Sequence, residues 1–151
     1  MKRTAAFTCL ALLAVASASP ALRADDEKKV QIKVNDEMKY DVTRIDAKAG
    51  QKVTVTLTNV GELPKVAIAH NFVILKAGTD AAAFAKAAMN HEAEGYMPPE
   101  LAGNVIAASK MVGAGESDTV RFIAPVAGTY DYICTFPDHF RSGMRGTLNV
   151  K

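Results

Sequence analysis

Residues 130–148 read Tyr130-Asp131-Tyr132-Ile133-Cys134-Thr135-Phe136-Pro137-Asp138-His139-Phe140-Arg141-Ser142-Gly143-Met144-Arg145-Gly146-Thr147-Leu148. Both ends of this stretch have the composition of β-strands, and Pro137 and Gly143 shape the loop between them. Cys134 stands at the end of the first predicted strand, His139 follows five residues later and Met144 five residues after that. One loop therefore brings a thiol, an imidazole and a thioether toward one point.

A fourth donor comes from an earlier segment, where His70 opens a predicted strand that runs to Leu75. Sulfur ligands suit Cu(I), imidazole suits both oxidation states, and a His₂Cys plane with a long axial Met lies between their preferred geometries. Zinc is more often offered a second thiolate or a carboxylate. The sequence therefore predicts one Cu(I)/Cu(II) ion held by His70, Cys134, His139 and Met144.

Each of these residues taken alone has a simpler interpretation. A single Cys at a strand end is usually an inert core residue, a single Met usually fills a gap in the core, and His70 alone could be a hydrogen-bonded core histidine. The spacing of Cys134, His139 and Met144 in one loop favours a metal site over three unrelated core residues.

The rest of the chain predicts an all-β protein. Residues 30–34 and 53–58 alternate apolar with polar side chains and are rich in β-branched residues, which is typical of strands with one buried face. Further strands are predicted at Tyr40–Ile45, Asn71–Leu75, Thr119–Ile123, Thr129–Cys134 and Gly146–Val150. Short strands at this spacing predict an antiparallel Greek-key β-sandwich of about seven or eight strands.

One segment interrupts this pattern. Thr79-Asp80 supplies a helix N-cap, and the alanine-rich residues 81–89 are strong helix formers. We expect one helix here, outside the sandwich.

The N-terminus resembles a secretory signal peptide. Met1-Lys2-Arg3 is basic, residues 4–18 are uncharged, and small residues lead up to Ala24. Cleavage is expected after Ala24, where a charged segment begins, with Ala18 as the alternative. The expected organisation is a cleaved signal peptide, 1–24, and a single domain, 25–151, located in the periplasm or alternatively outside the cell.

Charge and cysteine content change when the signal peptide is removed. The whole chain has 18 basic and 16 acidic residues, and loss of Lys2, Arg3 and Arg23 changes the net charge from +2 to −1, which gives no indication of nucleic-acid binding. Cys9 leaves with the signal peptide, so Cys134 enters an oxidising compartment without a partner. Such a thiol is an inert core residue, an intermolecular bridge, a nucleophile or a metal ligand.

Two ligand segments also resemble a known family. Residues 134–139 and 144–148 resemble the copper loop of azurins, and residues 63–65 and 70–73 resemble the segment that carries their first histidine. Residues 105–107 and 113–118 are similar as well. The resemblance implies a cupredoxin of the azurin/plastocyanin type, a soluble blue-copper protein that carries single electrons between redox partners.

The resemblance also implies roles for individual residues. His139 would be the ligand nearest the surface, and electrons would leave through its edge. Asn71 would tie the two ligand loops together near Thr135, next to Phe136, and backbone amides would hydrogen-bond the sulfur of Cys134.

Four departures from typical azurins stand out. The interval from His139 to Met144 is one residue longer and matches plastocyanins and auracyanins. Ala69 replaces a Gly, so a weak contact from its carbonyl to copper is an open expectation. Asp138 replaces another Gly, and the azurin disulfide has no second cysteine here.

Enzymes on the same fold, multicopper oxidases and nitrite reductases, typically have histidines beside the cysteine. Cys134 is flanked by Ile133 and Thr135, and the chain has only three histidines, so we expect no enzyme. A thiol hydrolase would leave Met144 without a role. A periplasmic copper carrier or storage protein with similar, more labile ligands is the remaining alternative.

Redox partners, a cytochrome or a reductase or oxidase, are expected to dock transiently near His139 on a monomeric protein. The apolar residues expected on that docking surface are Leu63, Pro64, Val66, Ile68 and Phe140. Such a contact would be small and apolar.

Overall fold

The structure is a computed structural model that describes residues 26–151. The predicted signal peptide, 1–24, lies outside these residues and stays a prediction. None of the helices within residues 26–151 has the length and apolar character that crossing a membrane requires.

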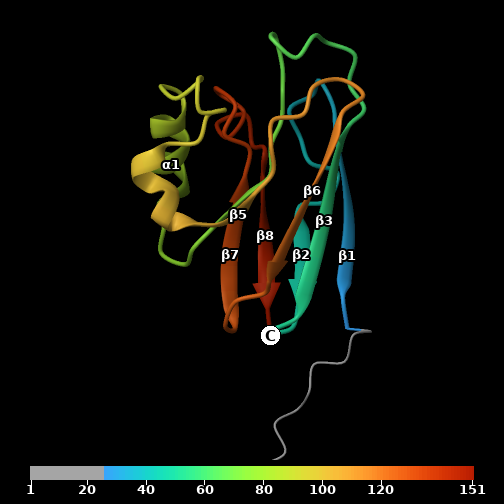
Figure 1. The fold of residues 1–151 in the computed structure, drawn as a ribbon, viewed down its shortest axis with the longest axis vertical. Helices are drawn as coiled ribbons and strands as arrows, with labels where there is room; N and C mark the ends of the chain where they lie inside the picture. Colours follow the sequence, from blue (N-terminus) through green and yellow to red (C-terminus); the bar gives the residue numbers. More distant parts are fainter. Residues whose placement is uncertain (1–25) are drawn as a thin grey trace, which may run out of the picture.

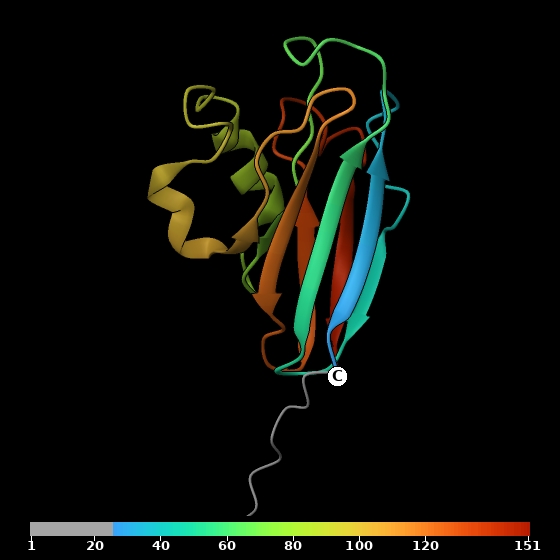
Figure 2. The ribbon, with the colours of Figure 1, turned by 45° about the vertical axis from the view of Figure 1, so that its right-hand side comes forward.

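Two β-sheets pack face to face, with one α-helix on the outside of the molecule (Figures 1 and 2). The smaller sheet has the order β1-β3-β6 and the larger β2-β8-β7-β4-β5. The strands are β1 (Lys28–Val34), β2 (Arg44–Ala47), β3 (Lys52–Asn59), β4 (Val73–Leu75), β5 (Val105–Ala108), β6 (Ser117–Ile123), β7 (Gly128–Ile133) and β8 (Arg145–Val150). The predicted sandwich of seven or eight strands is thus confirmed.

Strand pairing differs from the expected antiparallel pattern in two places. β1 pairs with β3, and β2 with β8, in parallel. The chain passes from β1 to β2 in the other sheet before it returns to β3, and such a crossover allows a parallel pair where a hairpin would not. The predicted strand 40–45 is also shorter, because Tyr40 forms only an isolated bridge with Val34 and β2 begins at Arg44.

The core lies between the sheets. β1 and β3 bury every second residue against it, as their alternation predicted. β4 is buried throughout because α1 (Ala81–Ala88) packs on the outer side of its sheet. Phe84 of α1 contacts the cluster formed by Val73, Leu75 and Ile133, a burial that contributes roughly 2–3 kcal/mol.

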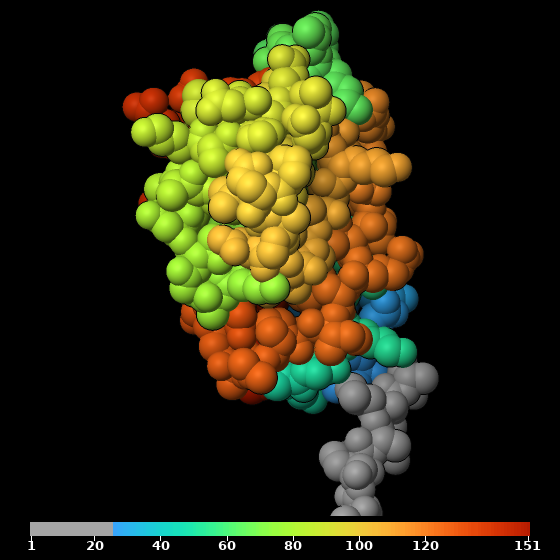
Figure 3. All heavy atoms as spheres, turned by 60° about the vertical axis from the view of Figure 1, so that its left-hand side comes forward, coloured from blue at the N-terminus to red at the C-terminus, as the bar shows by residue number. Residues whose placement is uncertain are grey.

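The predicted helix is confirmed together with its cap. The Asp80 carboxylate accepts hydrogen bonds from the backbone N–H groups of Ala82 and Ala83, both at 3.0 Å. A 3₁₀ helix, η1 (Pro99–Asn104), and the edge strand β5 follow, and neither was predicted. Their residues are only partly buried and show no clear period. Figure 3 shows the face that α1 and the residues through η1 cover.

Candidate metal centre

The loop between β7 and β8, residues 134–144, is closed by its own hydrogen bonds. The Cys134 N–H donates to the Met144 carbonyl at 3.2 Å, and the Met144 N–H donates to the His139 carbonyl at 3.0 Å. Gly143 has φ of +94°, a conformation that glycine adopts without steric cost. These bonds bring the three predicted ligands of the loop together at one end of the sandwich.

His70 reaches the same place through sheet pairing. Its backbone forms an isolated antiparallel bridge with Val112, with hydrogen bonds of 3.1 and 2.8 Å. Three residues later, Val73 of β4 pairs with Ile133 of β7, the residue before Cys134. The pairing of β4 with β7 therefore aligns the two ligand segments.

The side chains of His70, Cys134 and His139 converge. Their ligand atoms all lie within 4.8 Å of one another. The Sγ of Cys134 is 3.4 Å from Nδ1 of His139, and the two imidazole ring centroids are 4.8 Å apart. Met144 is fully buried and belongs to the core cluster that contains Cys134.

Burial controls the protonation of these groups. It lowers the pKa of His70 to about 4, against the partial opposition of the Asp36 carboxylate and the Asn35 backbone. Burial and then the neighbouring His70 lower the pKa of His139 to about 4. Both imidazoles are therefore neutral at pH 7 and have lone pairs available for a metal.

Cys134 shows the opposite shift for the same reason. Burial raises its pKa to about 12, while the backbones of Asn71 and Phe136 oppose the shift by favouring the thiolate. A cation in the site would stabilise the thiolate.

The residues fit copper. Both ring nitrogens of buried His70 lack a hydrogen-bond partner in the described part of the chain, an arrangement that costs free energy unless one of them binds something else. A thiol and two neutral imidazoles, with a buried thioether in the same core, are the donor set of a His₂Cys site with an axial Met.

Asn71 connects the two ligand segments. Its Nδ2 donates to Thr135 Oγ1 at 2.7 Å, and its Oδ1 accepts from the Thr135 backbone N–H at 2.9 Å. The hydroxyl of Tyr40 donates to the Asn71 carbonyl at 2.6 Å. Sequence reasoning placed Tyr40 only at the start of a predicted strand and missed this contact with Asn71. In the structure Tyr40 forms an isolated bridge instead of that strand.

Aromatic contacts extend outward from His139. Its ring centroid lies 4.8 Å from that of Phe136, which lies 5.2 Å from that of Tyr96. Next to Tyr96, Met97 places its sulfur 4.0 Å from Nδ2 of Asn71. Sequence reasoning missed Tyr96 and Met97, which lie in the irregular segment between α1 and η1.

The surface around the centre differs from expectation. His139 is the most exposed of the four predicted ligands, but its exposure is only 2%. Ile68 was expected on the docking surface and is instead buried, because it belongs to the turn that leads His70 into the core. Leu63 and Val66 are exposed, at 46% and 90%.

Two buried imidazoles and a buried thiol, with a buried methionine at the end of the same loop, form the donor set of a blue-copper, type 1 site for one copper ion on an all-β sandwich. Residues 26–151 match the family of copper binding proteins described as the plastocyanin/azurin family. The chain belongs to this family.

Individual relatives agree with this assignment. Auracyanin-B of Chloroflexus aurantiacus is 37% identical over 116 residues, which are 76% of this chain and 48% of auracyanin-B, so the chain spans about half the length of that relative. Azurin of Pseudomonas aeruginosa is 32% identical over 100% of this chain and 99% of its own. The crystal structure of reduced auracyanin from Roseiflexus castenholzii has a TM-score of 0.74 at 36% identity, covering 82% of this chain and 97% of the other.

Proposed function

We propose that this protein carries single electrons between redox partners through one copper ion held by His70, Cys134, His139 and Met144. The observation that carries the proposal is the convergence of three buried donor side chains within 4.8 Å, from two chain segments that Asn71 ties together. Met144 would supply the thioether ligand in this proposal, and the carbonyl of buried Ala69 would be a weaker contact.

Bound copper supplies a reversible one-electron couple between Cu(I) and Cu(II). The protein's contribution is to keep its ligands in one arrangement in both states. The loop hydrogen bonds of Cys134 and Met144 and the two bonds from Asn71 restrain the ligands, and the burial of all four excludes water.

The burial of the ligands also supports electron transfer over copper delivery. A carrier or storage protein must release its ion to a partner, which favours open, exchangeable ligands. The exposures of His70, Cys134 and Met144 are 0% and that of His139 is 2%. We propose that the protein is not an enzyme, since the cluster places no further metal-binding group beside these ligands among residues 26–151.

The remaining parts of the proposal concern the protein's environment. Residues 1–24 act as a signal peptide cleaved after Ala24, and residues 25–151 work as a monomer in the periplasm. The partners are a cytochrome, or a reductase or oxidase, that docks transiently.

The decisive experiment replaces Cys134 with Ser. Wild-type protein loaded with Cu(II) is expected to show a strong absorption band near the red end of the visible spectrum, from thiolate-to-copper charge transfer. Cys134→Ser removes the thiolate and is expected to abolish that band. An intact blue band in the variant overturns the ligand assignment. Replacement of exposed Ser142 by Ala, in the same loop, is the control and keeps the colour.

A further inference from the structure

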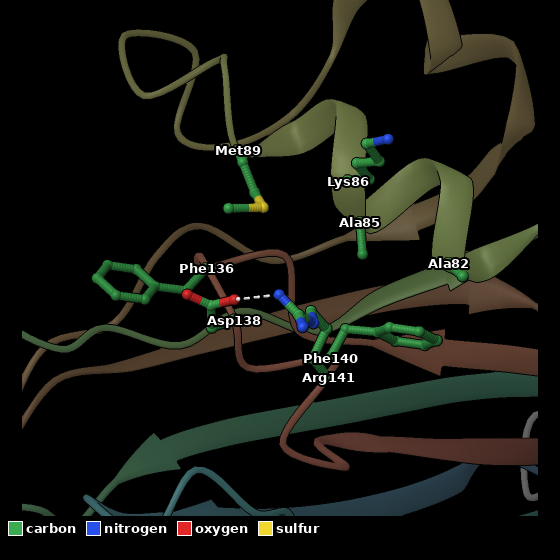
Figure 4. A pocket seen from close by; sticks show the side chains of 8 residues that line it. All are labelled: Ala82, Ala85, Lys86, Met89, Phe136, Asp138, Phe140 and Arg141. Carbon is green, nitrogen blue, oxygen red and sulfur yellow. Dashed lines mark hydrogen bonds and ion pairs between the residues drawn. The ribbon is translucent and has the colours of Figure 1, made fainter.

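A groove of about 490 Å³ runs between α1 and the ligand loop (Figure 4). The groove is lined from α1 by Ala82, Ala85 and Lys86 and from its C-cap by Met89. The ligand loop contributes Phe136, Asp138, Phe140 and Arg141. Because Ala82 and Ala85 end at Cβ, they leave space where longer side chains would fill the gap. The groove therefore exists because small residues, Ala82 and Ala85, face two phenylalanines of the loop.

This groove gives indirect access to the metal centre. His139 itself is 2% exposed, so a partner has almost no direct contact with it. Phe136 lines the groove, and its ring centroid is 4.8 Å from that of His139. A group in the groove therefore touches a ring that packs against a predicted copper ligand.

The charges at the groove are mainly positive. Lys86 has no ion-pair partner within residues 26–151. Arg141 pairs with Asp138 at 3.4 Å, but both side chains are largely exposed, at 81% and 62%, so the pair is weak. The described residues carry 15 basic and 15 acidic side chains. The positive charge is therefore a local property of this groove.

We propose that the groove docks a one-electron redox protein that presents an apolar side chain or cofactor edge flanked by carboxylates. The apolar group contacts Phe136, Phe140 and Met89, and a carboxylate faces Lys86 and Arg141. One electron passes between the partner and the copper site by way of Phe136 and His139. No bond forms or breaks and no proton moves. The inference rests on the proposed function, which it extends by specifying the partner's chemistry.

The residues of the groove suit a transient contact. Met89 is 40% exposed, and a flexible thioether adapts to differently shaped partners. The opposing charges raise the rate of encounter more than they raise affinity. A second copy of this chain is the alternative occupant, and the dependence of the groove signals on protein concentration tests it.

The first test measures binding of 2-naphthoate, an aromatic ring with one carboxylate, to the Cu(I) protein by NMR. We expect shifts of the methyl signals of Ala82, Ala85 and Met89, with a Kd on the order of 1 mM. The neutral analogue 2-naphthalenemethanol is expected to bind several-fold more weakly. Ala85→Trp fills the groove and is expected to abolish the shifts, whereas Ala83→Trp, on the exposed side of the same helix, keeps them.

The second test measures electron-transfer rates with hexacyanoferrate, an anion, and tris(phenanthroline)cobalt, a cation. Lys86→Glu is expected to lower the electron-transfer rate with the anion and raise the rate with the cation, each by about three- to tenfold at low salt. Both changes should shrink at high salt. Lys52→Glu, at the start of β3 in the other sheet, makes the same net charge change and is the control. Unchanged blue absorption in each variant shows that the copper site is intact, and the rates are compared at equal driving force by using the measured reduction potential of each variant.

Three outcomes overturn the inference. If Lys86→Glu and Lys52→Glu exchange electrons with each reagent at equal rates, electrons do not enter through the groove. Naphthoate shifts that survive Ala85→Trp show that the ring binds outside the groove. Groove methyl shifts that appear on concentrating the protein alone favour a second copy as the occupant. If wild-type protein exchanges electrons with neither reagent, the proposed function itself fails, which separates the two conclusions.

Discussion

The residue next to His139 is in a conformation that glycine adopts more readily than other residues. Asp138 has φ of +63°, in the left-handed region, which Asp tolerates better than most other non-glycine residues. Among residues 26–151 its carboxylate accepts no hydrogen bond from a backbone amide, and it pairs with Arg141 at 3.4 Å. The property of Asp138 that can affect the copper site is therefore its exposed negative charge, one residue from His139.

Replacing Asp138 with Asn is expected to raise the reduction potential. A carboxylate favours the more positive ion, Cu(II), so its loss favours Cu(I). At an assumed ~7 Å and an effective dielectric of ~20 the interaction is about 2 kcal/mol, equivalent to roughly 100 mV for one electron. Screening by water, salt and Arg141 should leave a few tens of mV, larger at low salt. Voltammetry at two salt concentrations measures the shift, and a potential that stays constant or falls contradicts it.

Met144 is expected to tune the copper site rather than anchor it. Met144→Gln supplies an oxygen donor, which favours Cu(II) over Cu(I) more than a thioether does, so copper should stay bound while the potential falls. Voltammetry and copper analysis of the purified variant check both parts. Loss of all copper, or an unchanged potential, argues against the axial role. The buried apolar variant Met144→Leu keeps the volume without a donor and should raise the potential.

At the scale of elements, the segment between α1 and η1 supports the ligand loop. Tyr96 has φ of +60°, and its N–H donates to the His91 carbonyl at 2.7 Å. The ring of Tyr96 then packs edge-on against Phe136. The strained backbone conformation of Tyr96 persists because the packing of its ring against Phe136 compensates for the strain.

Replacing Tyr96 with Leu is expected to loosen this support. Loss of the edge-to-face contact should lower the free energy of unfolding by about 1 kcal/mol and shift the blue absorption band, because Phe136 then restrains His139 less. Tyr96→Phe keeps the ring and is expected to leave both quantities unchanged. Urea denaturation and the visible spectrum of the three proteins provide the measurement. A Leu variant with a wild-type spectrum shows that the segment has no effect on the site.

At the scale of the whole molecule, the metal should stabilise the fold. The centre joins the segment before β4 to the loop between β7 and β8, so an ion bound there links both ligand segments only in the folded state. Without it, neither ring nitrogen of buried His70 has a hydrogen-bond partner among residues 26–151.

Copper removal is therefore expected to lower Tm. A ligand that binds only the folded state raises the free energy of unfolding by about 4 kcal/mol when its concentration is a thousand times its Kd. For a domain of this size that increase corresponds to a rise in Tm of roughly 10–20 °C. Calorimetry of metal-free and copper-loaded protein measures the difference. Cys134→Ser should gain much less from added copper. Equal Tm values for the two wild-type forms would show that the ion does not bind the folded state preferentially.

Several features of this protein could be predicted from its sequence because they are local. Cys134, His139 and Met144 share one loop, so their spacing alone indicated a common site. The alternation in β1 and β3 and the Asp80 cap of α1 likewise involve neighbours in the chain. Hydrophobic period and donor chemistry were therefore sufficient for the fold class and the copper prediction.

Only the tertiary structure decided what depends on residues distant in sequence. Tyr40 contacts Asn71 across 31 positions, and Met97 contacts it across 26. The link from Asn71 to Thr135, across 64 positions, was expected only from the family resemblance and not from the pattern of the residues. The burial of His139, the parallel pairing of β1 with β3 and the groove under α1 arise in the same way. A periodic pattern specifies which face of a strand or helix is buried but not which distant side chain it meets. That choice is made when the two sheets and α1 pack together and exclude water.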